Sequence, residues 1–329
     1  LPITDDRSLQ DITVPRPEPE GRDLLVAVEA VSVNPVDAKV RARATPAEGE
    51  WKVLGWDAAG VVEAVGPEAT LYAPGDAVFY AGAIGRQGTN AQYHLVDERI
   101  VGASPRSLSA SEAAALPLTA ITAWEALFDR LDVKRPVPGA TEAILIIGGA
   151  GGVGSMATQL AAKLTDLTVI TTASRGETAA WSKDLGATHV IDHTKPLAAQ
   201  IDALGLGAPA FVFSTTHTDQ HLAEIAKLIA PQGRFALIDD PQTLNIMPFK
   251  QKSVSTHWEF MFTRSMFGTE DIGKQGELLN EVSRLIDDGP LRTTLGESYG
   301  TINAANLKRA HALLESHRAK GKIVLEGWD

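Results

Sequence analysis

The sequence predicts an α/β protein in which a doubly wound parallel sheet is combined with a second, β-rich domain. Three observations support this fold class. Short β-rich runs separated by Gly and Pro fill residues 23–102, whereas apolar runs alternate with helical segments after Ser111. A glycine-rich loop at 148–154 joins one of these apolar runs to a helix. The chain has 329 residues, which is enough for about two domains.

The first part of the chain is expected to be all β. The runs 24–28 and 60–65 are rich in Val and Ala, and turn signals follow at Gly66-Pro67 and at Pro74-Gly75-Asp76. Helical spacing of apolar residues first appears near Ser111. We therefore expect the β-rich domain to end shortly after that residue.

The second part of the chain is expected to form βαβ units. Its strands are apolar without alternation, as is typical of parallel strands that are covered on both faces. We expect these strands at 143–147, 167–171, 189–191, 211–213 and 234–238. Helices at 153–164 and 222–229 each carry one apolar stripe. The chain then ends in a helix at 304–316 and a strand at 322–325, which we expect to return to the β-rich domain.

Composition excludes several classes of function. The net charge of -11 and the lack of a Lys and Arg cluster predict that neither nucleic acid nor an anionic membrane is a partner. No apolar stretch is long enough to span a membrane, and the first residues do not resemble a signal peptide, so we expect a cytoplasmic protein. Because the chain has no cysteine, disulfides, thiolate catalysis and thiolate metal sites are excluded.

The glycine-rich loop predicts a dinucleotide site. Gly149, Gly151 and Gly154 have the G-x-G-x-x-G spacing, directly after a buried strand and at the start of a helix that includes Gly152 and Val153. The missing Cβ atoms permit a tight turn, close approach of the backbone to a pyrophosphate, and close packing of helix on strand. The free N–H groups of the helix N-terminus would then face the anion. The alternative is a glycine-rich turn that binds no ligand.

The end of the next strand favours NADPH as the cofactor. NAD sites usually carry an acid there, about 20 residues after the loop, that binds the ribose 2′-hydroxyl. This chain has Ser174-Arg175 instead, and a guanidinium is the side chain best shaped to hold a 2′-phosphate. In the alternative interpretation Ser174 caps the next helix and Arg175 is solvated.

Several motifs together resemble the medium-chain dehydrogenase/reductase superfamily, and within it the zeta-crystallin-like quinone oxidoreductases and the zinc-type alcohol dehydrogenase-like proteins. Besides the glycine loop, the motifs are Val33-Asn34-Pro35-Val36-Asp37, Gly55-Trp56-Asp57-Ala58-Ala59-Gly60, Pro74-Gly75-Asp76 and Leu118-Thr119-Ala120-Ile121-Thr122-Ala123-Trp124. The resemblance implies a GroES-like substrate domain, which we place at 1–117 and 291–329, and a Rossmann NADPH-binding domain at 118–290. It also implies an active site in the cleft between the domains and a homodimer formed by pairing of sheet edges.

The positions that carry the catalytic zinc ligands in metal-dependent relatives are changed in this chain. Where the family has a Cys, a His and a second Cys, the sequence has Asn34, Trp56 and Leu118. Leucine cannot coordinate a metal, an indole N–H is only a donor, and a single amide oxygen is a poor ligand for zinc. We therefore predict no metal. His217 and His221 are four residues apart on a predicted helix, but they lack the acid of a metalloprotease motif, and a surface or capping role is favoured for them.

Without a metal to stabilise an alkoxide, a conjugated acceptor suits the chain better than an alcohol. We predict reduction of a small planar electrophile, a quinone, by hydride or electron transfer from NADPH. The alternatives are reduction of the double bond of an enone or 2-alkenal, and binding of NADPH with little turnover. Asn34, which the resemblance implicates, is the predicted hydrogen-bond donor to the substrate, unless it only forms the turn before Pro35. Lys39 replaces a tyrosine of the zeta-crystallin-like enzymes, so no tyrosine role is carried over.

The remaining candidate residues fall into two groups. Aromatic walls for a planar substrate are expected from Trp56, Tyr80 and Trp258. Position in the family implies that three further residues line the cofactor: Thr122, His193 and Ser214.

Overall fold

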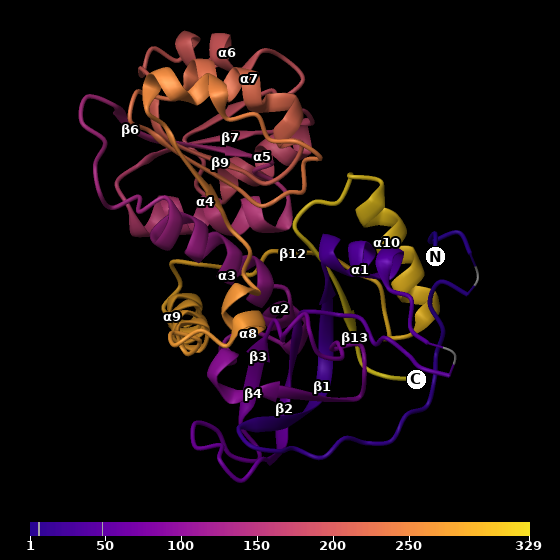
Figure 1. Cartoon of the computed structure of the whole chain (residues 1–329). Coiled ribbons are helices and arrows are strands. Elements are labelled where there is room, and N and C mark those ends of the chain that lie inside the picture. Colours follow the sequence, from indigo (N-terminus) through magenta and orange to yellow (C-terminus); the bar gives the residue numbers. More distant parts are fainter. Residues whose placement is uncertain (6, 48) are drawn as a thin grey trace. The chain divides into compact units, whose positions relative to one another are not determined.

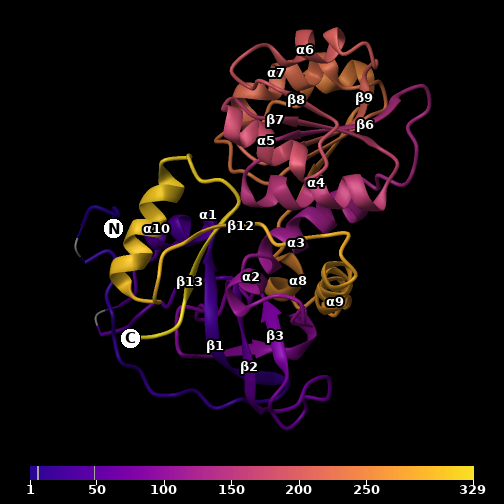
Figure 2. The same cartoon turned by 180° about the vertical axis from the view of Figure 1, so that it is seen from behind.

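The computed structural model describes residues 1–5, 7–47 and 49–329 and divides them into two compact units. The first unit comprises Leu1–Ile121 and Phe262–Asp329, and the second comprises Thr122–Met261. The second unit is therefore an insertion in the first. Figure 1 shows a sheet with helices in each unit, and Figure 2 shows the same elements from behind.

A seven-stranded sheet forms the core of the first unit, with the order β12-β13-β1-β2-β3-β5 and with β4 paired to β1. The bounds of its strands are β1 Asp23–Val33, β2 Ala58–Val65, β3 Ala77–Tyr80, β4 Tyr93–Asp97, β5 Val101–Ala103, β12 Leu295–Ser298 and β13 Lys322–Glu326. Most pairs are antiparallel, so this is the predicted β-rich domain. The last strand does return to it, because β13 pairs with β1 in the register Val33↔Ile323.

Short helices complete the first unit. Their bounds are α1 Pro35–Arg43, the 3-10 turn η1 Glu98–Ile100, α2 Ala110–Ala114, α8 Thr263–Phe267, α9 Lys274–Asp287 and α10 Ala304–Glu315. A further helix, α3 (Pro117–Trp124), runs across the boundary at Ile121. Helix α10 begins at Asn303, whose side chain accepts a hydrogen bond from the backbone N–H of Asn306.

Six parallel strands form the sheet of the second unit in the order β11-β10-β9-β6-β7-β8. Their bounds are β6 Thr141–Ile147, β7 Thr168–Thr172, β8 His189–Ile191, β9 Pro209–Ser214, β10 Arg234–Leu237 and β11 Ser255–Trp258. The last five residues of β6 are all buried, as expected for a central strand covered on both faces. Five of the strands were predicted, and β11 was not.

Helices cover both faces of this parallel sheet. Figure 1 shows α4 on one face and α6 with α7 on the other. The bounds are η2 Glu125–Arg130, a π-helical turn, then α4 Gly152–Leu164, α5 Gly176–Asp184, α6 Leu197–Ala203, α7 Thr218–Leu228 and the 3-10 turn η3 Met247–Lys252. The doubly wound α/β fold class is therefore confirmed.

The structure places the second domain boundary earlier than the sequence analysis did. We predicted a cofactor domain that extends to residue 290, but the second unit ends at Met261. The boundary lies earlier because helix α9, whose buried side chains include Leu279, packs on the sheet of the first unit. It packs on β5 so closely that a Cβ added to Gly102 would lie 2.6 Å from the Cβ atom of Leu279. Sequence periodicity shows that this helix is amphipathic, but not which sheet covers it.

In the described part of the chain, no helix is both long and apolar enough to cross a membrane.

Candidate functional site

The glycine loop of the second unit has the geometry that the sequence motif predicts. A Cβ atom added to Gly149 would lie 2.5 Å from the Cβ of Thr171 on β7, and one added to Gly154 would lie 2.1 Å from the carbonyl oxygen of Gly148. These two glycines are therefore required by packing. Gly151 is different, because its added Cβ would meet only the Gly148 oxygen, at 3.4 Å. Since packing does not require glycine there, the loop fits a ligand that approaches the backbone at Gly151.

The order of the strands places this loop at the topological switch point. Strand β6 lies between β7 and β9. The chain adds β7 and β8 on one side of β6, and then β9, β10 and β11 on the other side. Ligands of such sheets bind outside the carboxyl ends of the strands at this point. The backbone N–H of Gly148 donates to the hydroxyl of Thr172 at 3.0 Å, and on the other side Gly148 packs against Thr215. The loops after β6, β7 and β9 are thus connected by direct contacts.

Ser174 and Arg175 follow β7 at this edge. The N-cap of α5 is Arg175, without a side-chain capping hydrogen bond, so Ser174 does not cap the helix as the alternative interpretation required. The side chain of Arg175 is 38% exposed, and its guanidinium lies 3.3 Å from the carboxylate of Glu177. An exposed pair of this kind contributes little to stability.

The other predicted cofactor residues have varied surroundings. Gly152 and Val153 form the first turn of α4. Thr122 is buried at the start of the second unit, and Ser214 is buried at the end of β9, where its hydroxyl lies 2.8 Å from that of Thr218. His193 follows β8 and is partly exposed.

The first unit holds Asn34 in a buried polar network. Its amide nitrogen donates to a carboxylate oxygen of Asp57 at 2.7 Å and, at the longer distance of 3.4 Å, to the carbonyl of Ser32. The ammonium group of Lys322 donates to the amide oxygen of Asn34, to the carbonyl of Val33 at 3.0 Å, and to Asp57 at 3.1 Å. Asn34, Asp57 and Lys322 are all nearly inaccessible to solvent.

Burial changes the pKa values of two carboxyl groups beside Asn34, those of Asp57 and Asp37. Burial raises the pKa of Asp57, and the attraction of Lys322 together with hydrogen bonds from Asn34 and Leu118 opposes this shift. Burial also raises the pKa of Asp37 to about 7, although Asp37 accepts a 2.7 Å hydrogen bond from the backbone N–H of Asn34. The network is therefore a buried ion pair, formed by Asp57 and Lys322, with an amide and a second carboxyl group attached.

The residues at the three zinc-ligand positions of the family lie around Asp57. The backbone N–H of Leu118 donates to Asp57 at 2.7 Å, the side chain of Asn34 donates to it, and Trp56 precedes it in the chain. This donor set does not fit a zinc ion, because its members offer one amide oxygen, an indole donor and an alkyl group. Among the described residues no group of three or more His, Asp or Glu side chains could hold a metal ion.

The structure separates the three aromatic candidates. Trp56 is buried in the first unit and meets Phe262 edge to face, with ring centroids 6.5 Å apart. Tyr80 is fully buried in the core of the same unit, and its hydroxyl lies 3.1 Å from Nδ1 of His94. Its role as a substrate wall stays a prediction. Trp258 ends the edge strand β11 of the second unit and is 54% exposed.

Two members of the buried network, Asp57 and Lys322, had no predicted role. Asp57 belongs to the family motif at 55–60, and Lys322 is the first residue of the predicted strand at 322–325. The available signal was the single Lys at the start of the apolar run Lys322-Ile323-Val324-Leu325, since a charge in a buried strand requires a partner.

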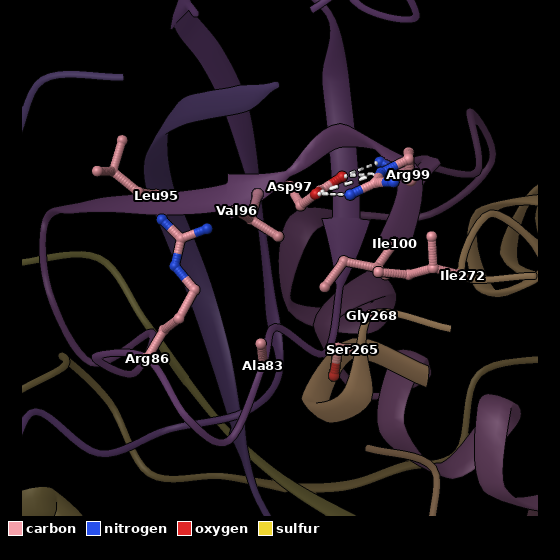
Figure 3. A pocket seen from close by; sticks show the side chains of 10 residues that line it. All are labelled: Ala83, Arg86, Leu95, Val96, Asp97, Arg99, Ile100, Ser265, Gly268 and Ile272. Carbon is pink, nitrogen blue, oxygen red and sulfur yellow. Dashed lines mark hydrogen bonds and ion pairs between the residues drawn. The ribbon is translucent and has the colours of Figure 1, made fainter. Parts of the chain in front are cut away.

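A small cavity elsewhere in the first unit contains none of the predicted site residues. It has a volume of about 150 Å³ and is lined by Ala83, Arg86, Leu95, Val96, Asp97, Arg99, Ile100, Ser265, Gly268 and Ile272 (Figure 3). Its two arginines are paired already, Arg86 with Asp23 at 2.7 Å and Arg99 with Asp97 at 2.7 Å. The cavity therefore offers no unpaired charge to a ligand.

Comparison with known proteins identifies the family of this chain. A family model for the GroES-like domain of alcohol dehydrogenases matches residues 20–107, and one for zinc-binding dehydrogenases matches residues 185–325. A zinc-type alcohol dehydrogenase-like protein of Staphylococcus aureus is 44% identical over 315 residues, which is 94% of this chain and 92% of that protein. A chloroplastic quinone-oxidoreductase homolog of Spinacia oleracea is 32% identical over 68% of this chain and 70% of its own length.

Solved structures share the fold over nearly the whole chain. A crystal structure from Rhizobium etli, given the provisional name of a zinc-dependent alcohol dehydrogenase, has 68% identity and a TM-score of 0.98, and covers 100% of this chain and 96% of that one. A mycobacterial protein solved in complex with NADPH is 28% identical with a TM-score of 0.80, over 96% of this chain and 94% of that one.

Proposed function

This chain belongs to the medium-chain dehydrogenase/reductase superfamily and is an oxidoreductase of that family, and from this premise we propose that it reduces quinones with NADPH and without zinc. The observation that carries the cofactor part is the Ser174-Arg175 pair at the end of β7, beside a glycine loop whose Gly151 is not required by packing. When bound, NADPH would supply the hydride. Gly149 to Gly154 would hold its pyrophosphate, and Arg175 its 2′-phosphate.

The choice of substrate follows from the donor set in the first unit. Asn34, Trp56 and Leu118 provide no ligand shell for a Lewis acid, so stabilisation of negative charge on the substrate falls to hydrogen-bond donors. A quinone spreads that charge over a conjugated ring and takes its proton from water, so it requires less from the protein than an alcohol does. The quinone-oxidoreductase homolog among the relatives favours the same class.

A substrate panel tests this function. Quinones, enones, 2-alkenals and simple alcohols would be assayed with NADPH and with NADH, and dissociation constants would be measured by nicotinamide fluorescence. We expect quinone turnover, little alcohol oxidation, and NADPH binding more than about tenfold tighter than NADH binding, which is about 1.4 kcal/mol. Arg175→Ala should remove most of this preference, whereas Arg135→Ala, which replaces another exposed arginine paired with an acid in the same unit, should not.

Three outcomes would change the proposal. Turnover confined to enones would replace the substrate class by activated double bonds. NADPH binding without turnover of any acceptor would leave a cofactor-binding protein. Equal affinity for the two cofactors would overturn the NADPH assignment.

Asn34 is the proposed donor to the substrate oxygen. Its amide nitrogen donates to Asp57 at 2.7 Å and to the carbonyl of Ser32 at 3.4 Å, and because the group is buried, a substrate oxygen would have to replace the longer bond to Ser32. We expect Asn34→Ala to lower turnover of a quinone about tenfold, and that of an enone more, because an enone delocalises less charge. Loss of stability alone would affect both acceptors equally, so the difference between them is the decisive measurement. Unchanged turnover with a lower melting temperature would make Asn34 a structural residue only.

A homodimer is part of the proposal. Strand β11 is an edge of the six-stranded sheet, and Trp258 at its end is largely exposed, so a second copy could extend the sheet. Light scattering should give twice the chain mass, and a monomer at micromolar concentration would contradict it.

A further inference from the structure

The indole of Trp56 carries a buried N–H group that has no hydrogen-bond partner among the described residues. Its side chain is 1% exposed, so the group is almost closed to solvent. Leaving a buried donor unpaired costs free energy, and folded proteins pair nearly all such groups. Other indoles of this chain follow that rule, since Nε1 of Trp328 donates to the carbonyl of Val28 at 2.7 Å and Nε1 of Trp181 donates to the hydroxyl of Ser155 at 2.8 Å. The exception at Trp56 therefore points to a partner that binds from outside.

The backbone on both sides of Trp56 is fixed by one neighbouring loop. Gly55 precedes it with φ +102°, and a Cβ added there would lie 2.5 Å from Oδ1 of Asn90. The carbonyl of Gly55 accepts a hydrogen bond from the backbone N–H of Thr89 at 2.9 Å, and the carbonyl of Asp57 accepts one from the Thr89 hydroxyl at 3.1 Å. The indole is thus held in place before any ligand binds, as a preorganised donor must be.

The pyrrole edge of the indole faces a residue without a side chain. A Cβ added to Gly82 would lie 4.0 Å from Cδ1 of Trp56, the carbon bonded to Nε1, and 3.7 Å from Cε1 of His94, with no other neighbour within 4 Å. A methyl group would fit there, so space is left beside this edge. His94 does not compete for the N–H, because its Nδ1 lies 3.1 Å from the Tyr80 hydroxyl and its Nε2 lies 3.0 Å from the carbonyl of Gln87.

The chemistry of the indole selects the kind of ligand. It can donate a hydrogen bond but cannot accept one, so its partner must be an acceptor such as a carbonyl oxygen. The ammonium group of Lys52 lies 5.9 Å from the centre of the indole ring, and a nearby positive charge favours an oxygen on which negative charge develops. Lys52 is partly exposed, so movement of its long side chain would open a path to the buried ring. Asp57, the next residue, binds the amide of Asn34 at 2.7 Å, which connects Trp56 to the other proposed donor.

We propose that the indole N–H of Trp56 donates a hydrogen bond to the carbonyl oxygen of the substrate as the hydride arrives. This inference rests on the proposed reduction of quinones, and it gives Trp56 a catalytic role beyond that of an aromatic wall. The indole transfers no proton. The hydride from NADPH carries two electrons and one hydrogen, and water supplies the proton that completes the hydroquinone. Because the bond strengthens as charge develops on the oxygen, it lowers the barrier more than it improves binding of the substrate.

Nuclear magnetic resonance of the ¹⁵N-labelled indoles tests this contact without turnover. The protein would be loaded with NADP⁺, which has no hydride to give, and titrated with tetramethyl-1,4-benzoquinone. The control ligand is 1,2,4,5-tetramethylbenzene, which has a similar shape but no oxygen. The Trp56 signal can be assigned through its contact with Phe262, whose ring meets the indole edge to face. We expect its N–H proton to move downfield with the quinone and not with the hydrocarbon, while the Trp328 signal stays in place.

Kinetics of Trp56→Phe test the catalytic role. This variant keeps an aromatic ring and removes the donor. We expect kcat for the quinone to fall about tenfold to a hundredfold, while KM and the affinity for NADPH change by less than about threefold. The matched control is Trp328→Phe in the same unit, which loses the same volume and a donor that is already paired. It should lower the melting temperature and keep the turnover.

The outcomes separate this inference from the proposed function. An N–H signal that the quinone does not move, or unchanged kcat in Trp56→Phe, would overturn the role of Trp56 and leave quinone reduction intact. An equal loss of kcat in Trp328→Phe would show that the effect is structural, and would also overturn it. Absence of quinone turnover in the original protein would overturn the proposed function and this inference together.

Discussion

Lys322→Met is expected to destabilise the first unit by about 3–5 kcal/mol, because it removes one partner of a buried ion pair and leaves the other behind. Methionine fills nearly the same volume, but it cannot donate to Asp57, to the amide oxygen of Asn34 or to the carbonyl of Val33. Hydrogen exchange of the β1 and β13 amides measures the free energy of opening of this unit. Lys274→Met, at an exposed lysine of the same unit, should change it by less than about 0.5 kcal/mol.

The pH dependence of this loss has a definite sign. Burial already raises the pKa of Asp57, and removal of the ammonium group would raise it further. A carboxyl group whose pKa is higher in the folded than in the unfolded state contributes stability at low pH that is lost as the pH rises through the folded pKa. The variant should therefore be closest to the original protein in acid and should lose stability toward neutral pH. If the loss were independent of pH and below about 1 kcal/mol, the pair would contribute little to folding.

Gly151→Val is expected to weaken NADPH binding at least about a hundredfold, which is about 2.7 kcal/mol, while the melting temperature changes little. Gly151 has φ −72° and ψ 171°, a conformation that valine adopts readily, and its Cβ would meet no neighbour except the Gly148 oxygen. The side chain would instead occupy the space through which a pyrophosphate approaches the backbone. Fluorescence titration and thermal unfolding of the same sample separate the two effects.

Gly154→Ala is the contrasting control. Its methyl group would lie 2.1 Å from the Gly148 carbonyl oxygen, which is backbone and cannot move aside, so this variant should lose stability together with binding. Unchanged NADPH affinity in Gly151→Val would show that the loop is not the pyrophosphate site.

The parts of the fold that sequence predicted are those controlled by local pattern. The run at 143–147 is apolar throughout, and the glycines that follow must leave room for Thr171 and for the Gly148 carbonyl, so strand, loop and helix α4 could all be predicted. Strand β11, with the sequence Ser255-Thr256-His257-Trp258, has too little apolar character to be recognised.

Features that depend on distant residues could not be predicted in this way. The sequence suggested that Tyr80 forms an aromatic wall of the substrate site. Only the packing of the first unit shows that its side chain lies in the core. The partners of Lys322 are at positions 33, 34 and 57, and no spacing rule connects a terminal strand with them.

The insertion of one unit within the other has a consequence for synthesis. The Ser32 hydroxyl donates to the carbonyl of Ile323, 291 residues later, so β1 has no partner in β13 until that strand has been synthesised. The second unit, by contrast, is continuous from Thr122 to Met261 and can fold while translation continues. The edge of β1 that β13 will cover lacks this partner during that interval, and an unpaired strand edge is prone to pair with another chain. Pairing of β13 thus completes the sheet of the first unit, and a chain that stops before residue 322 would lack this pairing.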